Sequence, residues 1–260
     1  MRINDSINHL FTSIKNAFHL LRGGHYSVFF DEFQNRLHSE SLSFGLQRDL
    51  HKPFENPSAK IKIDIRHLQE DDVKVLLGEE VSGMVNPRII SSQCALINAK
   101  IPTCFVAVTT TDKPCYMQWL IGSEDNDQIQ SHFKGVFPQL KKREALLEGA
   151  YGNPKFRGLR IMPAAMAQIA EKASLINARW VNTFVDVTNI ASLKGCRRSG
   201  FEPYLLRKER WFLFRLTISF HHLTEDLLNT YHLNTADHTQ KSMNGSRNQT
   251  KIQPEVQGVE

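Results

Sequence analysis

The segment 151–162, with the sequence YGNPKFRGLRIM, has residue types that could bind a phosphate group. Its pattern indicates that a strand ends, a short turn follows, and a helix begins close to an arginine and a glycine. The start of a helix exposes backbone N–H groups and a partial positive charge, so it attracts anions. Arg157 would add a fixed charge, and Gly158 would let the backbone approach a ligand closely. On these residues alone, a turn without any ligand remains the alternative.

Two glutamates precede this turn, on a strand expected over residues 144–151. Glu144 and Glu148 are four residues apart, so in a strand their side chains point to the same face. A carboxylate in such a place could act as a general base. The alternative is that either glutamate is a solvated strand residue or pairs with the basic run 141–143.

The elements around the turn must hold these groups in place. Apolar residues at helical spacing predict a helix over 162–176. The run 180–187 places apolar and β-branched residues at alternate positions, which predicts a strand. A second, short helix is expected over 189–199, opened by Asn189 and ended by Gly200.

This order of strand, Arg-Gly turn, helix, strand, Asn-led helix and Gly200-Phe201 resembles the GNAT superfamily of acyl-CoA N-acyltransferases. Eleven residues separate Asn189 from Phe201, which matches the spacing usual in that family. The resemblance covers about residues 61–217, and its specific motifs lie within 144–201. It implies an α/β (α+β) fold with a mixed, mostly antiparallel central sheet flanked by helices.

The resemblance also implies acetyl-CoA or another acyl-CoA as donor, and no metal. In that family the turn after the fourth strand grips the pyrophosphate of coenzyme A. The edge of that strand pairs with pantetheine where the fourth and fifth strands splay apart. Asn189 would bond to the cofactor or only cap its helix. By position, the implied cofactor residues here are Gly149, Ala150, Tyr151, Arg157, Gly158, Leu159, Arg160, Ile161 and Met162.

The implied reaction moves the acyl group directly from CoA to a small-molecule or peptide amine. Glu148, nearer to the splay, is the first candidate for the base that accepts the amine proton, and Glu144 is the second. Cys196 stands where many members carry a tyrosine that protonates the departing thiolate. A thiol with an ordinary pKa of about 8.5 could donate a proton, but it is a weak hydrogen-bond donor. A packing role for Cys196 is the alternative.

Three further residues depart from the family pattern. Arg160 stands where glycine is usual, Met162 where glycine or alanine is usual, and Pro163 removes one N–H from the first helical turn. Arg160, Met162 and Cys196, which stand in place of the usual small residues and tyrosine, support an alternative function: a non-catalytic module of the same fold that binds acyl-CoA or another protein.

The remaining patterns divide the chain into three parts. Residues 1–58 are expected to form a helical N-terminal extension, because apolar residues in 5–22 and aromatic residues after 25 have helical spacing. Residues 221–260 are expected to form a C-terminal extension, disordered after 234. Between them, residues 59–220 would form the GNAT-like domain, with strands over 61–66, 103–111, 114–121, 201–207 and 211–219, a helix from Asp71, and a loop over 122–139.

Composition limits the possible partners. The net charge of +5 and the pI of about 9.0 suit an anionic ligand, but the basic residues are too scattered to predict nucleic-acid binding. No apolar run approaches the roughly 20 residues that span a bilayer, and no signal peptide is evident, so a cytoplasmic protein is expected. The basic amphipathic segment 5–22 favours packing on its own domain or on a partner in a homodimer. Peripheral membrane contact through this segment is the alternative.

Overall fold

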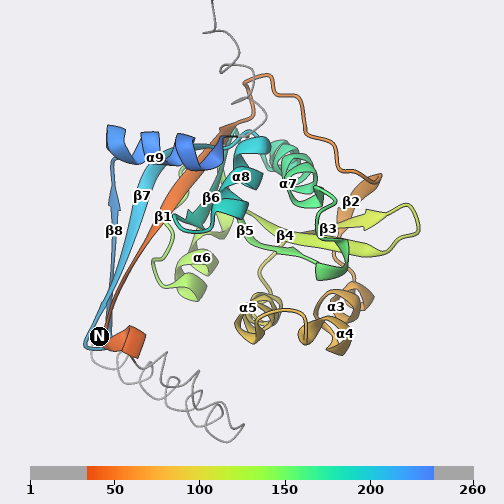
Figure 1. Ribbon diagram of the computed structural model, residues 1–260, viewed down its shortest axis with the longest axis horizontal. Coiled ribbons are helices and arrows are strands. Elements are labelled where there is room, and N and C mark those ends of the chain that lie inside the picture. Colours follow the sequence, from red (N-terminus) through yellow and green to blue (C-terminus); the bar gives the residue numbers. More distant parts are fainter. Residues whose placement is uncertain (1–33, 237–260) are drawn as a thin grey trace, which may run out of the picture.

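The computed structural model describes residues 34–236, which contain one eight-stranded sheet in the order β2-β3-β4-β5-β6-β1-β7-β8 (Figure 1). Neighbouring strands are antiparallel, except that β5 and β6 run parallel. The expected fold class is therefore confirmed. The strands are β1 (His38–Asp49), β2 (Ile63–His67), β3 (Cys104–Thr109), β4 (Pro114–Gly122), β5 (Glu144–Gly152), β6 (Trp180–Asp186), β7 (Glu202–Phe212) and β8 (Arg215–His221).

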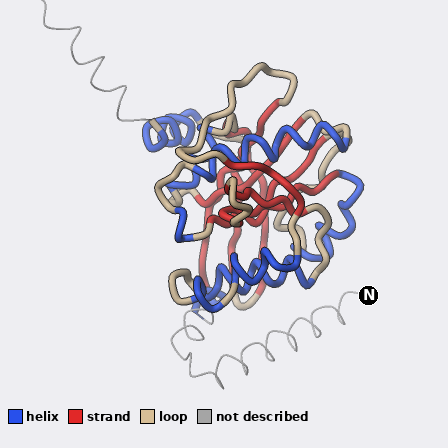
Figure 2. The backbone as a smooth tube through the Cα atoms, turned by 90° about the vertical axis from the view of Figure 1, so that its right-hand side faces the viewer, coloured by secondary structure: helices blue, strands red, loops and turns tan. Residues whose placement is uncertain are grey.

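Helices cover both faces of the sheet (Figure 2). One face carries α7 (Ile161–Glu171), α8 (Ile190–Arg198) and α9 (Glu225–Thr235). The other face carries α3 (Glu70–Leu77), α5 (Pro87–Asn98) and α6 (Asn126–Phe133), with the short α4 (Glu79–Ser82) after α3. Side-chain oxygens of Asn86, Asn189 and Thr224 accept backbone N–H groups and so fix the starts of α5, α8 and α9. Within residues 34–236 we find no helix with the length and apolar character needed to cross a membrane.

Each face has its own apolar core. On the first face, α7 lies close to the sheet because its inward residues are small: Ala164, Ala165, Ala167 and Ala170 are all buried. On the second face, Trp119 of β4 is buried among residues of the helical cover. The two cores hold the central strands from both sides, so departures from regular pairing in β5 are fixed in place.

The parallel pair β5–β6 is short and then splays apart. Its register covers only three pairs, from Glu144 with Trp180 to Leu146 with Asn182. On its other side, β5 continues to pair with β4 as far as Gly152, through a bulge near Gly149, which has a φ of +65°. Among residues 34–236, the edge of β5 on the β6 side therefore has no partner strand after Leu146.

The expectation of a helical extension over residues 1–58 is wrong for residues 38–49. These residues form β1, which lies between β6 and β7 and pairs with both. Leu42, Phe44 and Leu46 alternate with small or polar residues, which is the period of a strand, and they pack in the first core. The segment 5–22 lies outside the described residues.

Two other expectations need correction. Residues 122–139 were expected to be a loop, but they contain α6, which buries Ile129 in the second core. Separate strands were expected over 201–207 and 211–219, but β7 runs unbroken from Glu202 to Phe212 and the chain reverses at Leu213-Phe214. The charged residues 207–210, between the two expected runs, pair with neighbouring strands.

The C-terminal part beyond residue 220 begins as a packed helix. Tyr231 of α9 is buried, and its ring lies edge-on to Phe44 of β1, with the centroids 5.3 Å apart. Its hydroxyl donates to the carbonyl of Phe201 at 3.5 Å. β1 and α9 thus belong to the same folded unit as residues 59–220. The expected disorder concerns a tail that lies outside the described residues from 237 onward.

Candidate functional site

The turn after β5 forms an exposed loop that ends at an open helix start. Asn153 anchors it: its backbone N–H donates to Cys115 O at 2.9 Å, and its side chain accepts from Lys155 N at 3.0 Å. Arg157, Gly158 and Arg160 follow and are exposed. No side chain caps the start of α7, and its first turn contains no acidic residue. Backbone N–H groups of this turn, with two arginines beside them, suit an anion such as a phosphate.

The large residues that replace glycine in this loop are accommodated without closing it. Arg160 has a φ of 56°, so it adopts the left-handed conformation that glycine favours. Met162 points toward α8, where a Cβ on Gly195 would overlap its Sδ atom. Pro163 is buried, and its carbonyl accepts from Ser199 Oγ at 3.0 Å, which joins α7 to α8. A small residue in α8 therefore compensates for a large residue at the start of α7.

Asn189 and Cys196 have structural contacts in this fold. The side chain of Asn189 accepts from Ser192 N at 3.2 Å, which is a helix cap. Cys196 is 1% exposed, its Sγ lies 3.8 Å from Met166 Sδ, and burial raises its thiol pKa to about 12. A thiol so enclosed is a poor candidate to meet a substrate. The packing alternative for Cys196 and the capping alternative for Asn189 are both supported.

Glu148 and Glu144 have different surroundings although they share a strand. Glu148 is half-buried and follows the last paired residues of β5 and β6, so it lies where the two strands separate. Burial raises the pKa of Glu148, against the backbone N–H of Gly149 and the positive charge of Arg207, which lower it. Glu144 lies before the splay, and its Oε2 accepts from Lys141 N at 2.8 Å. Of the two, Glu148 is better placed to act as a base.

Arg207 of β7 is a residue of this region that the sequence did not single out. Its guanidinium lies over the rings of Phe137 and Phe184, at 5.3 and 5.0 Å from their centroids. It donates to Val136 O at 3.3 Å and to Ser43 Oγ at 3.2 Å. The arginine is therefore held rigidly in a mostly apolar setting.

Three carboxylates compensate the charge of Arg207. Its side chain is 11% exposed and forms an ion pair with Glu209 at 2.8 Å. Burial lowers the pKa of Arg207, while the negative charges of Glu209, Glu148 and Asp186 raise it. The Arg207 guanidinium and the Glu148 carboxylate thus act on each other across the splayed strands. The sequence did not identify Arg207 as a site residue, because it lies in β7, outside the motif region 144–201.

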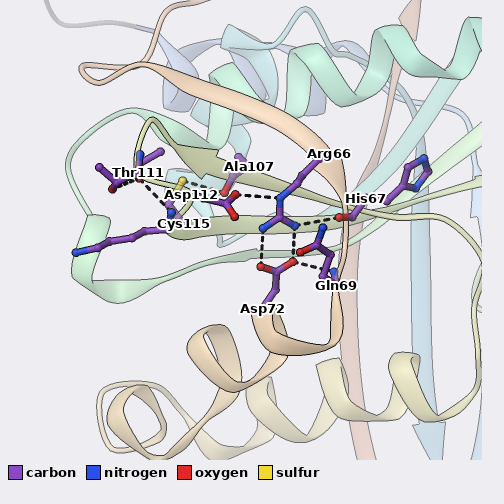
Figure 3. Close-up of polar contacts among 10 residues, drawn as sticks. Arg66, His67, Gln69, Asp72, Ala107, Thr111, Asp112 and Cys115 are labelled. Carbon is purple, nitrogen blue, oxygen red and sulfur yellow. Dashed lines mark hydrogen bonds and ion pairs between the residues drawn. The ribbon is translucent and has the colours of Figure 1, made fainter.

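The helices α3, α5 and α6 cover the face of the sheet on which Glu148 lies, and we call them the helical cover. Ion pairs of Arg66 join this cover to the sheet (Figure 3). Arg66 of β2 bonds to both carboxylate oxygens of Asp72 in α3, at 2.6 and 2.8 Å. It also bonds to Asp112, in the turn between β3 and β4, at 3.1 Å. At the other end of the cover, Leu96 of α5 packs so close to Gly149 that a Cβ there would lie 2.7 Å from its Cδ1 atom. The cover is therefore fixed relative to the bulge in β5.

Two open clefts lie elsewhere, at the C-terminal end of α7. Glu171 and Ser174 line both of them. Beside them, buried Arg48 donates to the carbonyls of Ala167 and Ser199, each at 3.1 Å, which satisfies backbone groups near the ends of α7 and α8. Residues 34–236 contain no group of three or more His, Cys, Asp or Glu side chains arranged to hold a metal ion.

Comparison with known proteins finds solved structures of low similarity to this chain. The GCN5-related glucosamine N-acetyltransferase region of a fungal multi-domain β-N-acetylglucosaminidase is 15% identical, with a TM-score of 0.49 over 76% of this chain and 23% of that one. A GNAT-family acetyltransferase from Colwellia psychrerythraea is 13% identical, with a TM-score of 0.44 over 76% of this chain and 62% of that one. The present chain thus spans less than two thirds of either.

A GNAT-family acetyltransferase from Brucella melitensis, solved in complex with acetyl-CoA, is 15% identical, with a TM-score of 0.40 over 63% of this chain and 97% of that one. No family model matches the sequence, and no curated protein matches it. The mostly antiparallel sheet, the single parallel pair β5–β6 with its splay and the loop after β5 agree with the fold that the resemblance in the sequence implies.

Proposed function

We propose that this protein transfers an acyl group from an acyl-CoA, such as acetyl-CoA, to an amine. One observation carries the proposal: the open edge of β5 at the splay leads directly into an exposed, basic loop at the uncapped start of α7. An elongated ligand with an anionic end and amide groups matches this pair of features. Coenzyme A has both, in its pyrophosphate and its pantetheine arm.

The donor would bind along this line. The pyrophosphate would accept hydrogen bonds from the loop between Arg157 and Met162, with Arg157 and Arg160 as counter-charges. The pantetheine amides would pair with the backbone of Gly149, Ala150 and Tyr151, as an added strand does. Pairing of β5 with β6 ends at Leu146, which leaves this edge open on that side.

The amine would attack the thioester carbonyl from the Glu148 side. This attack forms the C–N bond and a tetrahedral intermediate, which collapses as the C–S bond breaks, and the CoA thiolate leaves with the bonding electrons. Glu148 would take the proton that the amine loses, directly or through water. A carboxylate whose pKa is raised by burial suits this work better than an ordinary one, because a base works best with a pKa near the operating pH.

The thiolate would leave without help from Cys196, whose thiol is enclosed in the core. The transfer is direct, and no acyl-cysteine forms. The second candidate function is a module that binds acyl-CoA without turnover. Arg160, Met162 and Cys196, which stand in place of two small residues and a tyrosine, favour it.

Calorimetric titration with acetyl-CoA tests the donor site. We expect binding, and we expect Arg157→Ala to weaken it about tenfold or more, because a hydrogen bond to a charged group contributes about 1.5–3 kcal/mol. The matched control is Arg215→Ala, an exposed arginine at the far end of the β7–β8 hairpin, which should leave the affinity unchanged. Equal affinity of wild type and Arg157→Ala would contradict this placement of the pyrophosphate.

Thiol release separates the two functions once binding is established. The protein is incubated with acetyl-CoA and a panel of small and peptide amines, and free CoA is measured. Amine-dependent release that is lost in Glu148→Gln supports an enzyme. Binding of acetyl-CoA without release for any amine supports the non-catalytic module.

A further inference from the structure

The tip of the β7–β8 hairpin carries three large apolar side chains in contact with solvent. Phe212, Leu213 and Phe214 are 52%, 60% and 45% exposed. Figure 1 shows β1, β7 and β8 extending together to this tip, where the short helical segment 34–37 also lies. Large exposed apolar groups gathered at one projecting point mark an interaction site more often than scattered ones do.

The turn at this tip is made from residues that do not favour it. Phe212 pairs with Arg215, so Leu213 and Phe214 form a two-residue turn, with φ values of 46° and 63°. Two positive φ angles are the mark of a type I′ turn, in which Asn-Gly is preferred. Leucine and phenylalanine are strained in this conformation. These two residues cost stability in the turn and also expose apolar surface. Two unfavourable features at one place point to a function.

The residues next to the apolar tip are basic and aromatic. Arg210 and Arg215 are exposed, and the guanidinium of Arg36 lies 5.3 Å from the ring centre of Trp211. Two acidic residues of the neighbouring strands have basic partners: Glu209 pairs with Arg207 and Glu40, which lies opposite Arg210 in the β1–β7 register, pairs with Lys208, at 2.8 and 2.7 Å. The tip itself, residues 210–215, contains two arginines and no carboxylate.

The start of the described chain lies at the same place. The N–H groups of Leu213 and Phe214 donate to the carbonyls of Leu37 and Arg36, at 2.9 and 2.8 Å. These two bonds hold the described start of the chain against the turn.

We propose that this hairpin tip docks on an anionic lipid bilayer. A convex apolar tip can enter the bilayer interface, whereas a protein partner would need a matching pocket. A tryptophan and arginines just behind the apolar tip suit the headgroup layer, where aromatic rings and anionic lipids are found. This proposal does not depend on the acyltransferase chemistry.

Co-sedimentation of the full chain with vesicles tests the proposal. We expect binding to vesicles of phosphatidylcholine with about 30% phosphatidylserine, and weak binding without the anionic lipid. Replacing Leu213 by Asn together with Phe214 by Gly should reduce binding at least tenfold, because two large apolar side chains are lost. The same variant should melt at an equal or higher temperature, because Asn-Gly fits the turn. Leu175→Asn, an exposed leucine elsewhere, is the matched control and should bind like wild type.

Charge is tested in the same assay. Arg210→Gln with Arg215→Gln should weaken binding to anionic vesicles by about fivefold per arginine. The proposal is overturned if the wild-type protein does not bind vesicles with phosphatidylserine. It is also overturned if the Asn-Gly variant binds as well as wild type, since the contact would then lie elsewhere.

Discussion

Replacing Gly149 by alanine adds one carbon atom at a crowded position of the proposed site. It has a φ of +65°, and a Cβ there would lie 2.7 Å from both Leu96 Cδ1 and Trp119 Cε3. Because Trp119 is buried in the second core, its ring cannot move aside easily. Gly149→Ala should therefore strain the backbone and overfill the core at the same position.

The expected loss has two parts. A positive φ costs an alanine about 1–2 kcal/mol. Overpacking of a filled core costs about 1–3 kcal/mol more. Gly135 supplies the matched control, because its φ is +80° but a Cβ there would have no atom within 4 Å. Gly135→Ala should therefore lose only the first part, about 1–2 kcal/mol.

Urea unfolding of the three proteins, followed by circular dichroism, measures both losses. Gly149→Ala should lose about 2–5 kcal/mol in the free energy of unfolding. Acetyl-CoA affinity, measured where both variants are folded, should fall only for Gly149→Ala. Equal destabilisation of the two variants would refute the close packing of α5 and β4 against the bulge.

Three other changes test separate parts of the structure. Arg207→Gln removes a positive charge that lowers the pKa of Glu148, so the acid limb of the pH profile of kcat/KM should move to higher pH; an unmoved limb would remove Glu148 as the base. Arg66→Gln should cost about 3 kcal/mol at neutral pH, the low end for a buried pair because Arg66 is partly exposed, since it leaves the buried Asp72 carboxylate without its ion-pair partner. Burial tends to raise the pKa of Asp72, but the bonds from Arg66 and the Gln69 N–H hold it below its usual value. The wild-type protein should therefore lose this stabilisation as pH falls through that lowered pKa, whereas the variant lacks most of it at any pH. Cys196→Ala should leave kcat unchanged and lower the melting temperature, and a large fall in kcat would restore a catalytic role for the thiol.

The local motifs predicted the part of the fold that they encode. The strand, loop, helix and Asn-led second helix of residues 144–201 are found in the expected order, because capping, turn and periodicity signals act over a few residues. The position of β1 was not predictable in this way. Its pairing with β6 joins residues about 140 positions apart, such as Ser43 and Asp186, and the aromatic spacing before it suggested a helix.

The polar surroundings of Glu148 show the same limit. The charge of Arg207 acts on the Glu148 carboxylate from β7, a strand that is far from β5 in the sequence, and no local pattern signals this. The strained turn at Leu213-Phe214 was missed for another reason. Large apolar residues are typical of strands, so residues 211–219 were expected to form one strand. A two-residue turn with positive φ at Leu213 and Phe214 runs against the local preference of both residues.

A crystal structure of the protein with acetyl-CoA tests the central claim most directly. The account predicts pyrophosphate oxygens within about 3 Å of the backbone N–H groups of the loop from Arg157 to Met162. It also predicts pantetheine amides paired with the edge of β5 at Gly149–Tyr151, and the thioester close to Glu148. Acetyl-CoA bound elsewhere, for example in the clefts beside Glu171, would contradict it.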